Sequence, residues 1–307
     1  MFSILIPTFN NFNYLKLCLH SIKKNSKFNH EIIVHINDGS DGTLEYIKSN
    51  KINYTYSKKN IGLCSSLNLA AKQSSMKYLL YSHDDMYFCP RWDIYLSEEL
   101  NFSNNDFFYF SGTMIEPFKG AHLTYDCGKS IDTFNENKLI ENFSSLSFYD
   151  HQGTHFAPHL ISKRIWDLVG GFSEDFDPGI GSDPDFNMKL WNVGVRMFKG
   201  INRFRVYHFG SVTTRQKVNF KQNKGNKTFL LKWGITINFF KRHSNLDGII
   251  HFAASKSVGE SVKNPIKYYE NNINSLVYIL KELNFLKEPK FVFSSSCTVY
   301  GQVDKLQ

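Results

Sequence analysis

The first eighty residues alternate between short apolar segments and segments whose apolar residues recur at helical spacing, and this alternation constrains the fold most strongly. The pattern predicts strands at 3–6, 31–36, 52–56 and 78–81, and helices at 11–23, from 43 onward and at 62–73. Strands separated by helices of this length pair in parallel through right-handed crossovers. The sequence therefore predicts an α/β fold whose first strand is closed by Pro7.

Two adjacent carboxylates, Asp84 and Asp85, follow the last of these strands. Open α/β sheets bind ligands at the carboxyl ends of their strands, where Thr8 and Asp38 are also expected. Adjacent carboxylates repel each other unless a cation lies between them or one of them takes up a proton. Oxygen ligands suit Mg²⁺ or Mn²⁺, which proteins commonly share with substrate phosphates. An isolated Asp-Asp pair is more often a solvated turn, so the surrounding sequence decides between the two interpretations.

Several further motifs accompany the acid pair. They are Ile-Leu-Ile-Pro-Thr-Phe-Asn at 4–10, Asn-Asp-Gly-Ser-Asp at 37–41, Asn-Ile-Gly at 60–62, Gly-Gly-Phe at 170–172, Gly-Ser-Asp-Pro-Asp at 181–185 and Val-Tyr-His-Phe-Gly at 206–210. Each is weak alone, but together they resemble the family 2 glycosyltransferases. The resemblance implies a GT-A domain at 1–243, with a Rossmann-like, mostly parallel central sheet.

The resemblance also implies roles for individual residues. The nucleotide-sugar donor would contact Pro7, Thr8, Asn10, Asp38, Asn60, Gly62, Asn68 and Asp84, and Arg215 and Lys217 would lie near its diphosphate. Asp85 would be the main metal ligand, with Asp84 beside it and His208 as a further metal or diphosphate contact. Asp183 falls at the position of the general base, and Asp185 is its rival or orients it. Two departures from the family pattern are His83 before the acid pair and Ser182 before Asp183.

These roles fit the chemistry of glycosyl transfer with inversion. One group must deprotonate the acceptor hydroxyl, and a divalent metal, Mn²⁺ or Mg²⁺, would stabilise the departing nucleotide diphosphate. The expected reaction moves a sugar, with UDP-hexose as the favoured donor, to a hydroxyl of a glycan or lipid-linked glycan. Two alternatives are an epimerase acting on UDP-sugars and a non-catalytic module that binds nucleotide sugars.

Composition is consistent with a globular enzyme, since 42% of the 307 residues are hydrophobic and 16% aromatic. No segment reaches the ~18 uncharged apolar residues of a membrane span, and residues 1–6 lack the basic region of a signal peptide. The five scattered cysteines form no CxxC pair, which favours a reducing compartment. We therefore expect a cytoplasmic protein, at most in contact with the inner face of the membrane.

Eleven Lys or Arg residues and no acid occupy the segment from Lys199 to His243. An acid-free basic segment needs an anionic partner or a well-solvated face. No nucleic-acid recognition motif accompanies it, so we expect no nucleic acid to bind. Residues 228–242 also have the pattern of an amphipathic helix. Two interpretations of that helix stay open: peripheral contact with anionic lipid, or packing on the catalytic domain.

The C-terminal segment has a second resemblance. Its motifs are Asp-Gly-Ile-Ile-His-Phe-Ala-Ala at 247–254, Val-Gly-Glu-Ser at 258–261 and Phe-Val-Phe-Ser-Ser-Ser-Cys-Thr-Val-Tyr-Gly at 291–301. They resemble UDP-glucose 4-epimerases of the short-chain dehydrogenase superfamily. The pattern predicts one β-α-β unit of a Rossmann sheet within 244–307, as a truncated fragment. The glycine-rich turn that holds NAD and the catalytic Tyr-x-x-x-Lys of that family are absent, so NAD is not expected to bind. A gene fusion, a rearranged locus or an assembly artefact would each produce such a chain.

Overall fold

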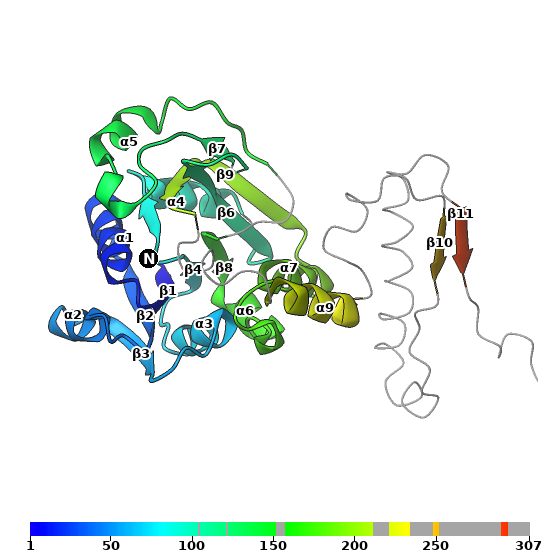
Figure 1. The fold of residues 1–307 in the computed structure, drawn as a ribbon. Helices are drawn as coiled ribbons and strands as arrows, with labels where there is room; N and C mark the ends of the chain where they lie inside the picture. The colour runs from blue at the N-terminus through cyan, green and yellow to red at the C-terminus, as the bar shows by residue number, and fades with distance from the viewer. Residues whose placement is uncertain are drawn as a thin grey trace, which may run out of the picture. The chain divides into compact units, whose positions relative to one another are not determined.

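The structure is a computed structural model that describes residues 1–103, 105–120, 122–151, 157–210, 221–233, 248–251 and 290–293. The chain divides into two compact units, Met1–Gly225 and Asn226–Gln307, and each is described by itself (Figure 1). The domain boundary expected at residue 243 stays a prediction.

Strands and helices alternate in the first part of unit Met1–Gly225, as the sequence predicts. The elements are β1 (Ser3–Phe9), α1 (Phe12–Asn25), β2 (Glu31–Asn37), α2 (Thr43–Ser49), β3 (Asn53–Ser57), α3 (Leu63–Lys72) and β4 (Tyr78–Tyr81). β1 pairs in parallel with both β2 and β4, and β2 pairs in parallel with β3. The carboxyl ends of these four strands therefore meet at one edge of the sheet.

The second part of this unit completes the sheet with strands of both directions. Its elements are β5 (Met86–Phe88), α4 (Trp92–Phe102), β6 (Phe108–Glu116), β7 (Leu123–Thr124), α5 (Glu136–Asn142), β8 (His159–Ser162), α6 (Lys163–Val169), α7 (Ser182–Asn192) and β9 (Met197–His208). In the described chain the strand order is β3-β2-β1-β4-β8-β6-β9-β5, with β7 beside β6. β8 runs antiparallel to β4 and β6, and β5 antiparallel to β9. The α/β class is confirmed, with a mixed central sheet.

The first strand does not end at Pro7, as the sequence analysis expected, but continues to Phe9. Pairing between β1 and β4 ends where Leu5 meets Tyr81. No residue of β4 lies opposite Pro7, so the missing N–H of Pro7 costs no hydrogen bond to that strand. Pairing with β2 continues through Pro7 and Thr8.

Helices pack against the sheet and bury an extensive apolar core. α3 packs on β1 and β2, α6 on β8 and on α7, α1 on β5, and α4 on β9 (Figure 1). A separate apolar cluster, made by Tyr87, Cys89, Ile115, Cys127, Leu139, Tyr207 and Phe209, fills the space beside β5 and the end of β9. This cluster supports the strand ends that carry the candidate site. The four cysteines among the described residues are free and buried.

The basic residues at the start of the acid-free segment have partners elsewhere in the fold. Lys199 lies 2.7 Å from Glu99 and 3.0 Å from Asp150, and Arg203 lies 2.8 Å from Glu98. Lys199 and Arg203 are therefore paired with acids within the protein, without an external anion.

Unit Asn226–Gln307 contains two described strands, β10 (Gly248–His251) and β11 (Lys290–Phe293), which pair in parallel. Parallel pairing agrees with the predicted β-α-β unit, although its predicted helix lies outside the described residues. Helix α9 (Lys221–Trp233) contains the start of the predicted amphipathic segment, and residues 234–242 lie outside the description. Among the described helices, none is long and apolar enough to cross a membrane.

Candidate active site and metal centre

The first acid of the pair, Asp84, is bonded to the end of β1 and the start of α1. The Thr8 hydroxyl donates to one carboxylate oxygen of Asp84 over 2.6 Å, and the Asn11 amide donates to the other over 3.0 Å. Burial first, and then the charge of Asp85, raise the pKa of Asp84 to about 7. Thr8 and Asp84 are thus brought together as expected. As a metal ligand Asp84 stays a prediction, since both of its oxygens already accept hydrogen bonds.

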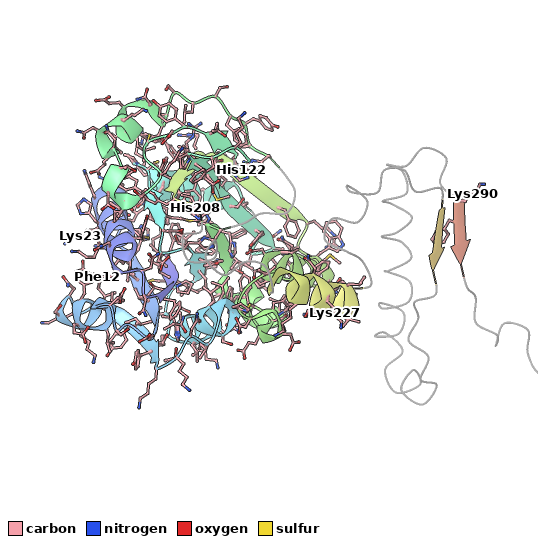
Figure 2. The ribbon with its side chains drawn as sticks, in the orientation of Figure 1. Phe12, Lys23, His122, His208, Lys227 and Lys290 are labelled. Carbon is pink, nitrogen blue, oxygen red and sulfur yellow. The ribbon has the colours of Figure 1, made fainter. Side chains whose placement is uncertain are left out.

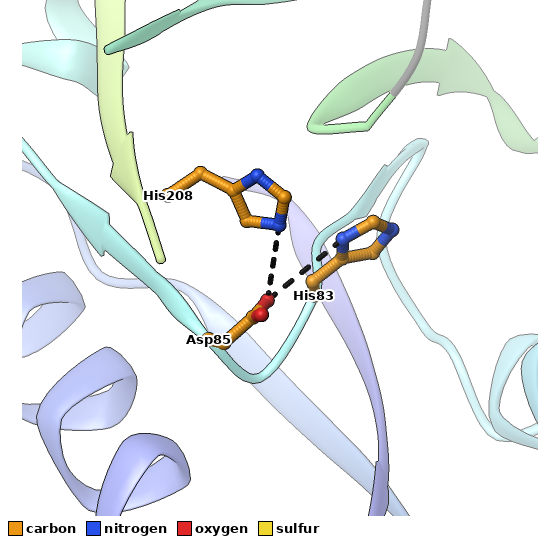
Figure 3. A group of neighbouring side chains, drawn as sticks. All are labelled: His83, Asp85 and His208. Atoms are coloured by element: carbon orange, nitrogen blue, oxygen red, sulfur yellow. Dashed lines mark ion pairs between the residues drawn. The ribbon is translucent and has the colours of Figure 1, made fainter. Parts of the chain in front are cut away.

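The second acid, Asp85, belongs to a group of three side chains that could hold a metal ion. His83 Nδ1 lies 3.9 Å and His208 Nε2 lies 3.3 Å from Asp85 Oδ1. Both imidazoles point toward this carboxylate in Figure 3, and His208 is placed in the whole fold in Figure 2. The candidate ligand atoms of the three residues all lie within 4.8 Å of one another. Two nitrogens and one carboxylate oxygen at this spacing suit a divalent transition metal.

The charges around this group favour a cation. Burial lowers the pKa of His83 to about 4 despite the nearby charge of Asp85, so this imidazole is neutral and can donate its lone pair. Burial also opposes a charge on His208, but the carboxylates of Asp85 and Glu116 outweigh it and raise the pKa of His208 to about 10. One imidazolium, His208, lies between Asp85 and Glu116, and a metal cation would relieve the repulsion from Asp85 that contributes to the raised pKa of Asp84.

A second set of contacts joins the end of β1 to the turn after β2. The side-chain amide of Asn10 makes both contacts. Its Nδ2 donates to Asp38 Oδ2 over 3.0 Å, and its Oδ1 accepts from the Gly39 N–H over 3.1 Å. Asn10 and Asp38 both have positive φ angles, of 45° and 66°. Such angles are uncommon outside glycine, and Asn and Asp are the side chains that tolerate them best. Asn10 and Asp38, two of the residues expected to contact the donor, are therefore brought together at the ligand edge of the sheet, and their contact with a donor stays a prediction.

Three other residues predicted to bind the donor are engaged in holding loops. The Asn60 carbonyl accepts from the Gly62 N–H, and Asn68 exchanges two hydrogen bonds with the backbone of Phe172. A Cβ at Gly62 would lie 2.2 Å from an Asp177 carboxylate oxygen, and Gly62 has a φ of 96°, so only glycine fits. Their contact with a donor stays a prediction.

The two acids at the start of α7 lie in different surroundings. Asp185 is fully buried and accepts a 2.6 Å hydrogen bond from the Ser173 hydroxyl. Asp183 Oδ1 is buried and has no hydrogen-bond partner among the described residues, and burial raises the pKa of Asp183 to about 7. A carboxylate with a pKa near neutral and an open oxygen is suited to accept a proton. Burial raises the pKa of Tyr81, and the charges of both Asp183 and Asp85 add to the shift.

Sequence reasoning missed two members of the site. The sequence marks His83 only as a departure from the family pattern, although its position two residues before Asp85 is a usable signal. Glu116, which contacts His208 at 2.5 Å, had no signal, because only the pairing of β6 with β9 brings it there. Arg215 and Lys217 lie outside the described residues.

Comparison with known proteins divides the chain in two. Residues 3–124 match the sequence profile described as "Glycosyl transferase family 2", and residues 205–307 match the "NAD dependent epimerase/dehydratase family". An uncharacterized glycosyltransferase of Rickettsia prowazekii, RP339, is 31% identical over 182 residues, which are 57% of this chain and 56% of that protein. A UDP-glucose 4-epimerase of Yersinia enterocolitica is 49% identical over 63 residues, which are 20% of this chain and 18% of that enzyme. The chain thus spans little more than half of one relative and under a fifth of the other.

Solved structures agree with the GT-A fold. Staphylococcus aureus TarS 1-349 in complex with UDP-GlcNAc superposes with a TM-score of 0.55 at 16% identity, over 92% of this chain and 81% of TarS. GalNAc-T7 with UDP, GalNAc and Mn²⁺ gives a TM-score of 0.52 at 14% identity, over 68% of this chain and 43% of GalNAc-T7.

Proposed function

We propose that this chain, whose residues 3–124 form a family 2 glycosyltransferase domain, is an inverting, metal-dependent glycosyltransferase with a UDP-hexose donor. The observation that carries the proposal is the grouping of His83, Asp85 and His208 at the ligand edge of the sheet. TarS bound to UDP-GlcNAc and GalNAc-T7 bound to UDP and Mn²⁺ share this fold, which supports a UDP-sugar and a divalent metal. The proposed acceptor is a hydroxyl of a glycan or a lipid-linked glycan.

The donor atoms fit a divalent metal, and two imidazoles favour Mn²⁺ over Mg²⁺, which prefers oxygen ligands. When bound, the metal would supply positive charge that stabilises the departing diphosphate. Asp38, held by Asn10, binds the nucleoside. Asp183 accepts the proton of the acceptor hydroxyl while the new bond to the anomeric carbon forms and the bond to the diphosphate breaks. Asp185, bonded to Ser173, fixes the first turn of α7 on which Asp183 lies.

Four further parts of the proposal rest on the sequence. Arg215 and Lys217 contact the diphosphate, residues 228–242 contact the membrane surface, the protein acts in the cytoplasm, and the C-terminal unit does not bind NAD.

A donor screen tests the proposal. UDP-glucose, UDP-galactose and UDP-GlcNAc, with GDP-mannose for comparison, are incubated with the protein and Mn²⁺, and both the melting temperature and the release of nucleotide diphosphate are measured. We expect one UDP-sugar to raise the melting temperature and to be hydrolysed slowly, both only with Mn²⁺.

Asp85→Asn is the matched variant, since it keeps the side-chain volume but removes the anionic ligand. It should lose the Mn²⁺-dependent stabilisation by UDP-sugar, while Asp175→Asn, a change at an exposed acid outside the metal group, should keep it. Donor binding and hydrolysis that are identical in wild type and Asp85→Asn would place the metal elsewhere. No stabilisation or hydrolysis with any donor would contradict the proposed activity itself.

A further inference from the structure

A partly buried carboxylate lies behind one of the two candidate histidine ligands. Glu116 is the last residue of β6 and His208 is the last residue of β9. These strands run in parallel with Ile115 opposite Tyr207, so the next residue of each strand falls side by side at the same edge. Glu116 Oε1 lies 2.5 Å from His208 Nδ1, and the two side chains are only 15% and 5% exposed.

The two ring nitrogens of His208 consequently have different partners. Nδ1 donates its proton to Glu116, while Nε2 points toward Asp85 at 3.3 Å. In metal sites the hydrogen bond at one imidazole nitrogen decides which nitrogen is left for the metal and how the ring is turned, and an anionic acceptor makes the ring a stronger ligand. His208 has the same arrangement, with Glu116 at Nδ1 and with Nε2 left to face the metal group at Asp85.

The other candidate histidine lacks such a support. In the described part of the chain, the His83 ring pairs with one carboxylate, that of Asp85, at 3.9 Å. This pair uses Nδ1, the nitrogen that faces the site. The His83 side chain is also more exposed, at 29%. His208 is therefore the fixed ligand of the pair, and the feature that fixes it is Glu116.

A purely structural role explains this contact less well. β6 and β9 are already paired from Phe108 to Ile115, and the Thr113 hydroxyl donates to the Ile201 carbonyl. One more ion pair at the end of such a long ladder adds little to the cohesion of the two strands.

We propose that Glu116 is a positioning residue that holds His208 Nε2 toward a divalent cation and strengthens its bond to that cation. This inference rests on the metal centre of the proposed function. It adds a residue that does not itself touch the metal or the substrate.

The test measures metal binding without any substrate. Co²⁺ alone is titrated into wild type, Glu116→Ala and Glu116→Gln, and its visible absorption bands report both affinity and coordination. Gln keeps an oxygen that can accept from Nδ1 but removes the charge, so it remains usable if the Ala variant does not fold. We expect Co²⁺ affinity to fall about 10- to 100-fold in Glu116→Ala, with altered bands, and by a smaller factor in Glu116→Gln.

Asp93→Asn is the matched control. Asp93 also pairs with a buried histidine, since Asp93 Oδ2 lies 3.1 Å from His30 Nε2 with side chains 0% and 2% exposed, but neither belongs to the metal group. This control should lower the melting temperature and leave Co²⁺ affinity and spectrum unchanged.

Each contrary result has its own meaning. If wild type binds Co²⁺ and both Glu116 variants bind it equally well with the same spectrum, Glu116 does not position the ligand. If Asp93→Asn loses Co²⁺ affinity to the same degree, the effect reflects general destabilisation and the inference is again overturned. If wild type itself shows no Co²⁺ binding, the metal centre of the proposed function fails, and this inference fails with it.

Discussion

At the scale of single residues, the main question is how two nearby acids divide their roles. Asp185 is fully buried and accepts a hydrogen bond from Ser173, whereas Asp183 Oδ1 has no hydrogen-bond partner in the described chain. A residue that must receive a proton needs an oxygen that is not already committed. This difference favours Asp183 as the base, a distinction that the spacing of the two acids in the sequence does not make.

Asp183→Asn should lower the rate of transfer by about 10²- to 10⁴-fold, the range for a lost general base, and leave donor affinity nearly unchanged. Asp185→Asn keeps an acceptor for Ser173 and should cost less. The measurements are the transfer rate at saturating donor and the donor dissociation constant. If Asp185→Asn reduced turnover more at unchanged donor affinity, the roles would be the reverse.

The pH dependence follows from the raised pKa of Asp183. Because burial raises this pKa from 3.8 to about 7, the carboxyl is protonated in the folded protein at pH 5 and ionised above pH 7. The transfer rate should therefore increase with pH and level off above about 7. The unfolded chain loses this proton near pH 4, so the stability that Asp183 contributes should fall as pH rises from about 4 to 7. Urea unfolding of wild type and Asp183→Asn across this range checks the sign. The free energy of unfolding of wild type should fall relative to that of Asp183→Asn as the pH rises, and an increase relative to the variant would contradict the prediction.

At the scale of elements, segments distant in sequence are joined by polar contacts at helix ends. Asp177 accepts hydrogen bonds from the Cys64 and Ser65 N–H groups, at 2.7 and 3.2 Å, and thereby caps the first turn of α3. These are among the N–H groups that a helix leaves without partners. The cap connects α3 with the loop that leads into α7.

Asp177→Ala should lower the free energy of unfolding by roughly 1–2 kcal/mol, the usual cost of removing a helix cap. Asp175→Ala, an exposed acid in the same loop, is the control and should change stability by less than about 0.5 kcal/mol. Denaturant unfolding of both variants decides. Equal stabilities would mean that the cap contributes nothing to the folded state.

The order of elements also explains what could be predicted. Thr8 lies at the end of β1, and Asp38 and Asp84 follow β2 and β4. These strands pair in parallel, so alternation alone places the three residues at one edge. Glu116 and His208 meet because β6 pairs in parallel with β9, which in turn pairs antiparallel with β5. Local periodicity does not encode this order of strands. The predicted end of the first strand at Pro7 was wrong, because a missing N–H interrupts a strand only where a neighbouring strand needs it, and β4 ends before Pro7.

At the scale of the whole molecule, residues 3–124 and residues 205–307 match different families, and the candidate site lies in unit Met1–Gly225. β10 and β11 form a two-stranded parallel sheet in the described part of unit Asn226–Gln307. A dinucleotide site needs a glycine-rich turn at a helix N-terminus to hold the pyrophosphate, and the sequence shows none.

A protein truncated after His243 should keep its donor hydrolysis, and the full-length protein should not bind NAD. The truncated and full-length proteins are compared by UDP release and melting temperature, and NAD is titrated into the full-length form by calorimetry. Saturable NAD binding, or loss of hydrolysis on truncation, would show that residues 244–307 are a functional domain.

The place of β5 in the sheet has a consequence for biosynthesis. In the described chain β5 pairs only with β9, so the segment just after Asp85 has no strand partner until residues 206–208 have been made. Until then the acid loop is held by the hydrogen bonds of Asp84 to Thr8 and Asn11 and by the packing of β5 on α1, while more than a hundred further residues leave the ribosome. A nascent chain can complete the group of His83, Asp85 and His208 only after His208 has been made, so any affinity for metal that needs all three side chains arises late in synthesis.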